Sequence, residues 1–362
     1  IFFFFLIKPK KIIFFVESKP HWLSSRQGYF TMERNERVDE FPNSFMRALK
    51  KNLNSFDLRT YPDTHLIYEE VSRWLKIKNN QLIIHEGADG GLLRVFEVFI
   101  SGGDRVITCS PSFAMYPVYC KMFGAIHCPI KLKVKNYDYF SELKKKIIKI
   151  KPKLVAIANP NQPIEVMLNI KQIEEICKLS QRFGSLVIID EAYYHFNNIT
   201  AQPLIKRFKN LIVVRTFSKA FGVAGMRIGY TMSNSKVIGL MLSIKPIYEI
   251  NAFNMKLVRH LIKNIKVMKK YVKEIHKGRS LLNKFLMSKN IEMIGKFSNT
   301  VLFKLDNKKK VDRVIKYLFK NKFIVRPMII DNDNRYIRTT LGSSKIMMKF
   351  NEKLKIALER YN

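Results

Sequence analysis

Short apolar runs alternate with longer amphipathic stretches between about residues 80 and 230. The runs are rich in Ile and Val, as strands are, whereas GLLRVFEVFI, which follows the first of them, has the apolar spacing of a helix. This alternation predicts a mostly parallel sheet with helices on both faces. Ligands of such sheets bind beyond the carboxyl ends of the strands, so chemistry is expected where each run ends. The strand-like runs are QLIIHEG, DRVITCS, AIHCPI, KLVAIANP, SLVIIDEAYY and LIVVRTFSKA.

A long periodic stretch follows the sheet region and indicates a second domain. Apolar residues recur every three or four positions from Leu257 to Ile275, up to Gly278, which predicts one helix that joins two domains. Beyond it, TVLFKL, FIVRP and YIRTTL are strand-like and KKKVDRVIKYLFKNK is helix-like, which favours a smaller α+β domain. We therefore expect a tail and arm over residues 1–60, a large domain over 61–250, and the linking helix with the small domain over 251–362.

The charge of the chain is unusual, because 65 Lys and Arg residues face 29 Asp and Glu residues, a formal net charge of +36. A nucleic acid, an anionic membrane or an acidic partner would each suit such a charge. The basic residues run from Lys8 to Lys355 without a concentrated patch, so we expect neither nucleic acid nor membrane as a partner. The four cysteines are scattered, without a CxxC pair, which predicts no metal site and a reducing, cytoplasmic location.

The N-terminal segment IFFFFLIKPKKIIFFV fits neither a secretory signal nor a spanning helix. A signal peptide has its basic residues before the apolar run, and here Lys8, Lys10 and Lys11 follow it. A spanning helix needs about 20 apolar residues, whereas this run breaks after Ile7. A tail, part of an upstream extension and a weak membrane-surface contact all fit the segment, and it is left out of the predicted fold.

The most specific strand end lies in VVRTFSKAFGVAGMRIGY. The apolar run ends at Ser218-Lys219, glycines follow, and Arg227 lies eight residues beyond the lysine. A lysine just past a buried strand, between a hydroxyl donor and an arginine, suits a Schiff base beside a phosphate. The alternative, a surface lysine in a glycine-rich turn, is disfavoured.

Other strand ends carry polar or small residues that each have an ordinary structural explanation when taken singly. Asp190 could cap a helix, the turn Gly87-Ala88-Asp89 could simply begin one, and Tyr116 could belong to the core. The amide side chains of Asn159, Asn161 and Gln162 end another run and could donate to a ligand oxygen. Their occurrence in order, at successive strand ends, favours one shared site.

At this point the chain resembles the fold-type I pyridoxal-phosphate enzymes, and within them the histidinol-phosphate aminotransferase family. The resemblance covers roughly residues 30 to 345 and implies an α/β fold, with a mostly parallel seven-stranded sheet and a smaller α+β C-terminal domain. The motifs that carry it are MERNERVDEFP, RTYPD, EGADGG, SPSFAMYPVY, ANPNQP, VIIDEAYYHF, RTFSKAFGVAGMRIGY and FIVRP followed by YIRTTLG.

The resemblance implies that the cofactor is pyridoxal 5′-phosphate and that Lys219, Asp190 and Tyr193 are the catalytic residues. Lys219 carries it as a Schiff base and later moves a proton between substrate and cofactor. Asp190 pairs with the pyridinium nitrogen, so that the ring can delocalise a carbanion. The other implied contacts are Tyr193, Asn161 and Gln162 at the phenolic oxygen, Tyr116 over the ring, Gly87, Ala88, Asp89, Ser218 and Arg227 at the phosphate, and Tyr61 from a second subunit.

The resemblance also implies how the substrates are held. Arg338, with Arg326 as a weaker candidate, binds their carboxylate or phosphate through the forked geometry of the guanidinium. Asn35, in the N-terminal arm, is the matching substrate-side position. The implied partners are a small-molecule amino donor and acceptor and a second copy of the chain.

The chain departs from the family's pattern in two places. The family usually reads NPNNPTG where this chain reads NPNQPIE, so Gln162 stands where an asparagine is expected and Glu165 replaces a glycine. The arm reads NERVDEFP rather than a NENP-like sequence. Both departures bear on the substrate and the reaction, and both leave the cofactor assignment intact.

Three functions follow, in decreasing order of support. The first is an aminotransferase that moves an amino group between an amino acid and a small, possibly phosphorylated, carbonyl compound. The second is a decarboxylase of a phosphorylated amino acid, because the same ring residues serve that reaction on this scaffold. The third, a basic binding protein without activity, is disfavoured by the complete set Lys219, Asp190, Tyr193 and Arg227.

Overall fold

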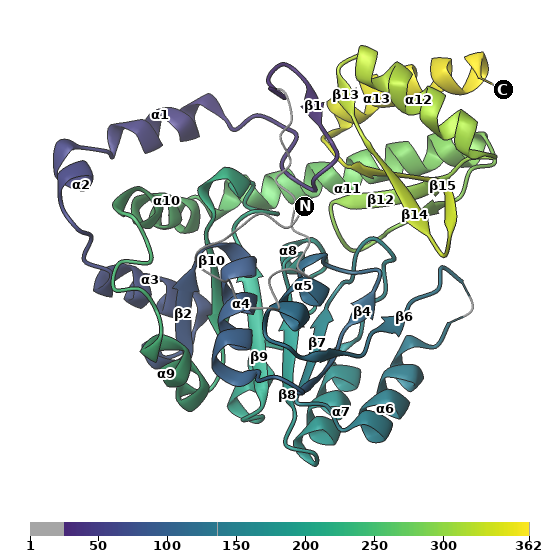
Figure 1. The fold of residues 1–362 in the computed structure, drawn as a ribbon. Coiled ribbons are helices and arrows are strands. Elements are labelled where there is room, and N and C mark those ends of the chain that lie inside the picture. The colour runs from purple at the N-terminus through teal and green to yellow at the C-terminus, as the bar shows by residue number, and fades with distance from the viewer. Residues whose placement is uncertain (1–24, 136, 362) are drawn as a thin grey trace, which may run out of the picture.

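A seven-stranded sheet with the order β2-β10-β9-β8-β7-β3-β5 lies at the centre of the larger part of the molecule (Figure 1). The computed structural model describes residues 25–135 and 137–361. Strand β10 is antiparallel to both β2 and β9, and the other pairs are parallel, which confirms the predicted mostly parallel sheet. The strands are β2 (Leu82–His85), β3 (Arg105–Ile107), β5 (Ile126–His127), β7 (Leu154–Ala158), β8 (Leu186–Asp190), β9 (Leu211–Thr216) and β10 (Gly229–Met232).

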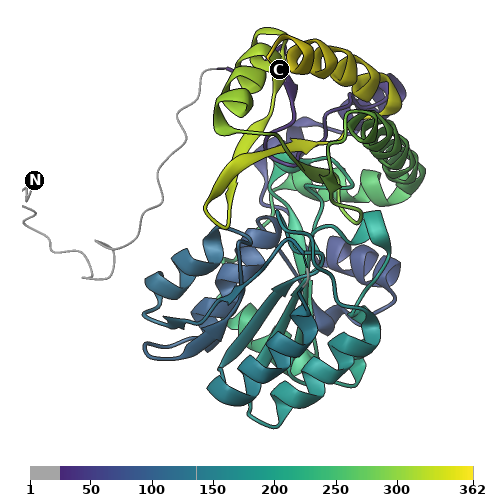
Figure 2. The same cartoon turned by 90° about the vertical axis from the view of Figure 1, so that its right-hand side faces the viewer.

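Both faces of this sheet are buried, because successive strand residues pack into two different apolar clusters. Ile188 and Ile212 belong to one cluster, whereas Ile189 and Val213 belong to the other. Figure 2 shows helices on both sides of the sheet, as predicted. The first face is covered by α4 (Gly87–Phe99), α5 (Met115–Met122) and α9 (Ser235–Ser243), and the second by α3 (His65–Leu75), α6 (Tyr139–Ile150), α7 (Ile170–Gln181) and α10 (Ala252–Lys263).

A second, antiparallel sheet of four strands, in the order β11-β12-β15-β14, lies above the first in Figure 1. Helices α12 and α13 pack beside it, and this arrangement confirms the α+β character predicted for the C-terminal part. Its elements are β11 (Met293–Ile294), β12 (Thr300–Lys304), α12 (Lys308–Lys320), β14 (Arg326–Ile330), β15 (Asp333–Thr340) and α13 (Ser344–Arg360). The residue boundaries predicted for the domains stay a prediction.

The single linking helix predicted from residues 257–278 is wrong in two respects. The stretch forms two helices, α10 and α11 (Ile265–Ser288), and it breaks at Asn264, whose side chain donates to the carbonyl oxygen of His260 at 2.9 Å. Nor does Gly278 end a helix. It lies inside α11, where a Cβ atom would stand 2.2 Å from the carbonyl oxygen of Gly342, so the glycine permits close packing on the segment before α13.

The N-terminal arm crosses from the small sheet toward the large one. Phe30 pairs with Phe323 in a short parallel ladder, and the chain then passes over the carboxyl end of the large sheet. The apolar segment discussed above lies outside the described residues, and no helix among those described is long and apolar enough to cross a membrane. The remaining elements are β1 (Phe30–Thr31), β13 (Phe323–Ile324), α1 (Asn43–Lys51), α2 (Ser55–Arg59), η2 (Asn79–Gln81), β4 (Cys109–Ser110), β6 (Ile130–Lys131), α8 (Tyr194–Asn197), η3 (Gln202–Lys206) and η4 (Ala224–Met226).

Candidate active site

The strand order brings the sequence motifs to one edge of the large sheet. Strands β7, β8 and β9 are parallel neighbours, so their carboxyl ends lie side by side. Strand β10 begins at Gly229, which pairs with His85 at the end of β2 and with Thr216 at the end of β9. The residues just before β10 therefore lie between the glycine turn after β2 and the lysine motif after β9.

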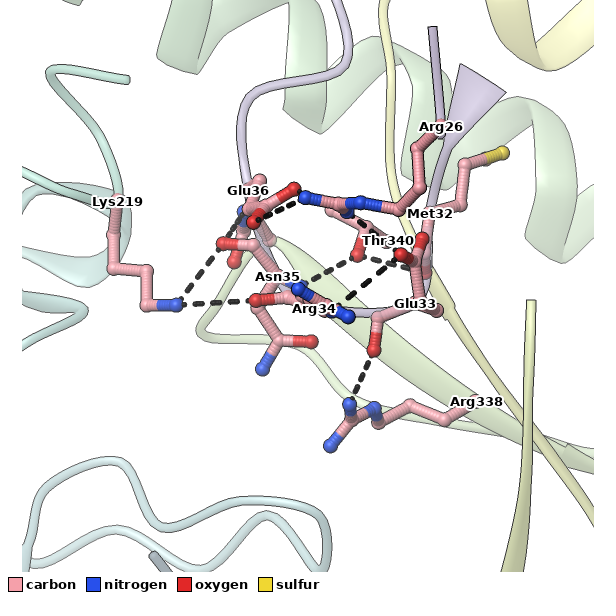
Figure 3. A network of polar contacts seen from close by, with 10 residues as sticks. Arg26, Met32, Glu33, Arg34, Asn35, Glu36, Lys219, Arg338 and Thr340 are labelled. Atoms are coloured by element: carbon pink, nitrogen blue, oxygen red, sulfur yellow. Dashed lines mark hydrogen bonds and ion pairs between the residues drawn. The ribbon is translucent and has the colours of Figure 1, made fainter. Parts of the chain in front are cut away.

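Lys219 lies beside the N-terminal arm, with its amine directed at the arm's backbone (Figure 3). Its Nζ atom donates to the carbonyl oxygens of Arg34 and Asn35, at 3.4 and 3.2 Å. Burial lowers the pKa of this amine from 10.5 to about 8, and the nearby cations Arg338 and Arg227 act in the same direction. A lysine with this pKa is partly neutral near pH 8, which is the form that reacts as a nucleophile.

Asp190 ends strand β8 and is 7% exposed. Its Oδ1 atom accepts a hydrogen bond from the backbone N–H of Ala192 at 3.0 Å, and its Oδ2 atom lies 3.5 Å from the hydroxyl of Tyr116. Burial raises the pKa of the carboxyl from 3.8 to about 6, although the hydrogen bonds from Ala192 and Tyr116 act in the opposite direction. A cationic partner would stabilise the ionised form.

Tyr193 and Asn35 form a polar pair close to the lysine. The amide of Asn35 donates to the hydroxyl oxygen of Tyr193 at 2.7 Å, and burial raises the pKa of that hydroxyl to about 12. Asn35 itself adopts a left-handed backbone conformation, which asparagine tolerates, and its N–H donates to Oγ1 of Thr340 at 3.0 Å. The arm is thus held by one side chain from the loop after β8 and by one from the small sheet.

The glycine turn at the start of α4 lies against Arg227. Gly87 has a positive φ of 72°, and a Cβ atom there would stand 2.6 Å from Nη2 of Arg227, so only glycine fits. Arg227 lies 3.4 Å from Oγ of Ser218, and Ala88 and Asp89 follow in the first turn of the helix. An arginine, a hydroxyl and the N-terminus of a thirteen-residue helix form a site suited to a phosphate.

Two of the three predicted amide donors, Asn161 and Gln162, are not available to a ligand in this arrangement. Asn161 uses both of its amide hydrogens within the chain, toward the carbonyl oxygens of Pro111 and Ile164 at 3.0 and 2.9 Å. Gln162 likewise uses both, toward Oε1 of Glu165 and Oγ of Ser298, each at 2.9 Å. Their predicted contact with a ring oxygen therefore lacks a donor here.

Tyr116 is also placed differently from the prediction. It is fully buried, so its ring has no open face on which a ligand could stack. Phe113, three residues earlier, is 38% exposed and meets Tyr116 edge-on at 5.8 Å. Sequence reasoning missed Phe113, although it stands in the same SPSFAMY motif.

Arg338 and Arg326 face each other on neighbouring strands of the small sheet. Arg338 donates from Nη2 to the carbonyl oxygen of Glu33 at 2.6 Å, and its buried Nε has no partner among the described residues. Burial lowers the pKa of its guanidinium, and Arg326 adds to that effect. An incompletely paired arginine at this point is ready to bind an anion.

Tyr61 does not join this cluster within one chain. It is 74% exposed and stacks on Tyr248, with ring centroids 4.1 Å apart. A second residue absent from the prediction, Asn299, donates to the carbonyl oxygen of Asn35 at 3.2 Å. Because 264 positions separate the two, no local pattern could have signalled that contact.

Comparison with known proteins is consistent with this geometry. Residues 31–353 match the family described as aminotransferase class I and II. A histidinol-phosphate aminotransferase of Caldanaerobacter subterraneus is 33% identical over 290 residues, which are 78% of this chain and 81% of the relative.

Two solved structures share the fold at 20% identity. One is a histidinol-phosphate aminotransferase of Sinorhizobium meliloti in complex with pyridoxal-5′-phosphate, with a TM-score of 0.81. The superposition covers 92% of this chain and 91% of that structure's chain. The other is an L-threonine-O-3-phosphate decarboxylase of Porphyromonas gingivalis, with a TM-score of 0.75. The superposition covers 91% of this chain and 99% of that structure's chain. The fold alone therefore does not separate the two reactions.

The match over most of the chain and the identity to a curated relative decide the family. They confirm the resemblance inferred from the motifs and reject the binding protein without activity, and they support the decarboxylase less well than the transferase. The chain belongs to the class I and II aminotransferase family, and it is an aminotransferase.

Proposed function

We propose that this enzyme uses pyridoxal 5′-phosphate to transfer an amino group between an amino acid and a phosphorylated carbonyl compound of the histidinol-phosphate type. The observation that carries the proposal is the meeting of Lys219, Asp190 and the Gly87–Arg227 contact at one sheet edge. There the charges of Asp190 and Arg227 both act on the pKa of Lys219. The relative from Caldanaerobacter subterraneus supports the substrate class.

The residues present suit this cofactor. The turn at Gly87 lets a phosphate approach the backbone beside Arg227, with Ser218 and the amides of Ala88 and Asp89 as further donors. Asp190 is a buried carboxylate that gains from a cation, and a protonated pyridine nitrogen supplies one.

The proposed chemistry divides between the cofactor and the chain. The bound cofactor supplies an electron sink for the carbanion formed when the substrate's Cα loses a proton. Lys219 holds the cofactor covalently and carries that proton, since its lowered pKa lets it both accept and return one near neutral pH. Asp190 would keep the ring nitrogen protonated, and the Tyr193 hydroxyl would donate to the phenolic oxygen. We propose that Phe113, rather than Tyr116, covers the ring.

We propose that Arg338 receives the acidic group of both substrates in turn, with Arg326 beside it. The support is the burial of Arg338, its Nε without a partner among the described residues, and its position on the strand opposite Arg326. A guanidinium can hold either a carboxylate or a phosphate through two parallel hydrogen bonds.

A stoichiometric assay separates transfer from decarboxylation. The loaded enzyme is mixed with histidinol phosphate or with O-phosphothreonine, and cofactor absorbance and CO₂ are followed together. With histidinol phosphate, which has no carboxyl group to lose, we expect conversion to the pyridoxamine form. With O-phosphothreonine we expect no release of CO₂. Release of CO₂ with the original absorbance restored would identify a decarboxylase and refute the proposed reaction.

We propose that the site is completed by a second copy of the chain. Tyr61 lies on an exposed apolar surface, which a monomer seldom presents over so many neighbouring side chains. Helix α2, on the left of Figure 1, contributes to it. The exposed apolar residues of this surface are Phe56, Leu58, Tyr61, Leu66, Ile247 and Tyr248.

Mixing two inactive variants tests the shared site. In a hybrid of Tyr61→Phe and Lys219→Ala subunits, one of the two sites receives both intact residues. Random pairing makes half of the dimers hybrids, so we expect about a quarter of the wild-type activity. Each variant alone is measured first and must be nearly inactive. A monomer by light scattering, with full activity, would contradict the proposal.

A further inference from the structure

The turn at residues 295–299, between β11 and β12, is where separate parts of the chain meet. Asn299 donates to the carbonyl oxygen of Asn35, which belongs to the arm. Asn197 of α8 and Arg279 of α11 donate to backbone carbonyls of the same turn. The turn therefore connects the arm, α8 and α11 to the small sheet.

Gln162 and Glu165 tie the loop after β7 to this turn. Gln162 donates to Oε1 of Glu165 and to Oγ of Ser298, each at 2.9 Å. The other carboxylate oxygen of Glu165 accepts the backbone N–H groups of Phe297, at 2.9 Å, and of Lys296. The carboxylate of Glu165 thus accepts from two backbone N–H groups and from one side-chain amide. Hydrogen bonds to a carboxylate are stronger than those between two neutral groups. We call these contacts the Glu165 clasp.

The Glu165 clasp lies next to the strand pair that carries Arg338. Strand β12 begins at Thr300, directly after the turn, and Thr300 pairs with Thr340. Leu302, two residues further, pairs with Arg338. Because the register of the pair is continuous from Thr300 to Lys304, we expect a shift of the turn to be passed on to Arg338.

We propose that Glu165 is a positioning residue, which fixes the turn at residues 295–299 and through it sets the place of Arg338. This inference rests on the proposed role of Arg338 in substrate binding. The proposal also gives one explanation for both unusual residues of NPNQPIE, Gln162 and Glu165. The longer amide of Gln162 and the carboxylate of Glu165 act together, and neither needs to contact the substrate.

Exchange and kinetics on the loaded Glu165→Ala enzyme test the proposal. Hydrogen–deuterium exchange at residues 296 and 297 is expected to quicken roughly tenfold, because both N–H groups lose a charged acceptor. The KM for histidinol phosphate is expected to rise about tenfold while kcat changes less than about threefold, since Arg338 is displaced rather than removed. The absorbance of the bound cofactor is expected to persist.

Glu292→Ala is the matched control. Glu292 pairs with Lys135 at 2.6 Å across the same two parts of the molecule, but both side chains are more than half exposed, at 59% and 65%. Exposed pairs contribute little, so neither exchange nor KM is expected to change. Glu165→Gln is the second variant, for use if Glu165→Ala folds poorly. It retains one acceptor oxygen and turns an N–H₂ group toward Gln162, so its effects on exchange and KM are expected to be smaller than those of Glu165→Ala.

Three results would overturn the proposal. Unchanged exchange at residues 296 and 297 shows that the clasp does not hold the turn. Faster exchange with an unchanged KM shows that the clasp is merely structural. Equal effects in Glu292→Ala show general loosening. If the enzyme does not transfer the amino group at all, the proposed function fails separately, and spectral titration with histidinol phosphate then replaces KM as the measure of binding.

Discussion

Lys219→Ala is expected to abolish covalent attachment of the cofactor and to lower the transfer rate by roughly a hundred- to ten-thousandfold, the usual contribution of a positioned proton carrier. The reason is that Lys219 has two proposed tasks, attachment and proton transfer, and alanine can do neither. Borohydride reduction of the loaded wild-type enzyme, followed by peptide mapping, is expected to label Lys219 alone. Labelling of another lysine would contradict the assignment.

The pH dependence of attachment identifies the same residue independently. With a pKa near 8, about a tenth of Lys219 is neutral at pH 7, roughly 300 times the fraction of a lysine at 10.5. The neutral fraction of the amine rises with pH. Capture of the cofactor by the unloaded enzyme is therefore expected to reach half of its maximal rate near pH 8 and to level off above about pH 9. Lys209→Ala, at an exposed lysine before β9, serves as the control and should leave the profile unchanged.

Arg338→Ala is expected to lower kcat/KM of both half-reactions by about 30-fold to several thousandfold. Truncating one partner of a desolvated charged contact costs about 2–5 kcal/mol, much of it from the anion left unpaired, and each 1.36 kcal/mol is a factor of ten. Because one arginine is proposed to serve both substrates, both half-reactions should weaken together while the absorbance of the bound cofactor persists.

Arg335→Ala controls for a general disturbance of β15. Arg335 lies on the same strand, but its guanidinium pairs with Asp333 at 2.8 Å on the surface. This variant should retain nearly full activity. Loss in only one half-reaction of Arg338→Ala would show that the two substrates use different anchors, and no loss in either would remove Arg338 from the proposed site.

Much of the architecture could be predicted from local pattern. A strand buried on both faces is apolar at nearly every position, so β7, β8 and β9 were recognised from their sequences, and their polar ends marked Asp190 and Lys219. Strand β10 was not recognised, since Gly229 and Tyr230 were assigned to the lysine motif and no strand was predicted for the two residues that follow. The break at Asn264 was missed as well, because the apolar period continues across it.

The sequence by itself determined which residue types stand at the strand ends, and with them the family and the cofactor chemistry proposed here. Only the tertiary structure decided what those side chains contact. Gln162 was expected at a ring oxygen, yet Ser298, 136 positions away, and Glu165 take both of its amide hydrogens. Tyr116 was expected over the ring, yet packing encloses it and leaves Phe113 exposed. The physical reason is that a hydrophobic pattern reports on the local backbone and on burial, whereas a hydrogen bond depends on atoms that distant segments bring together.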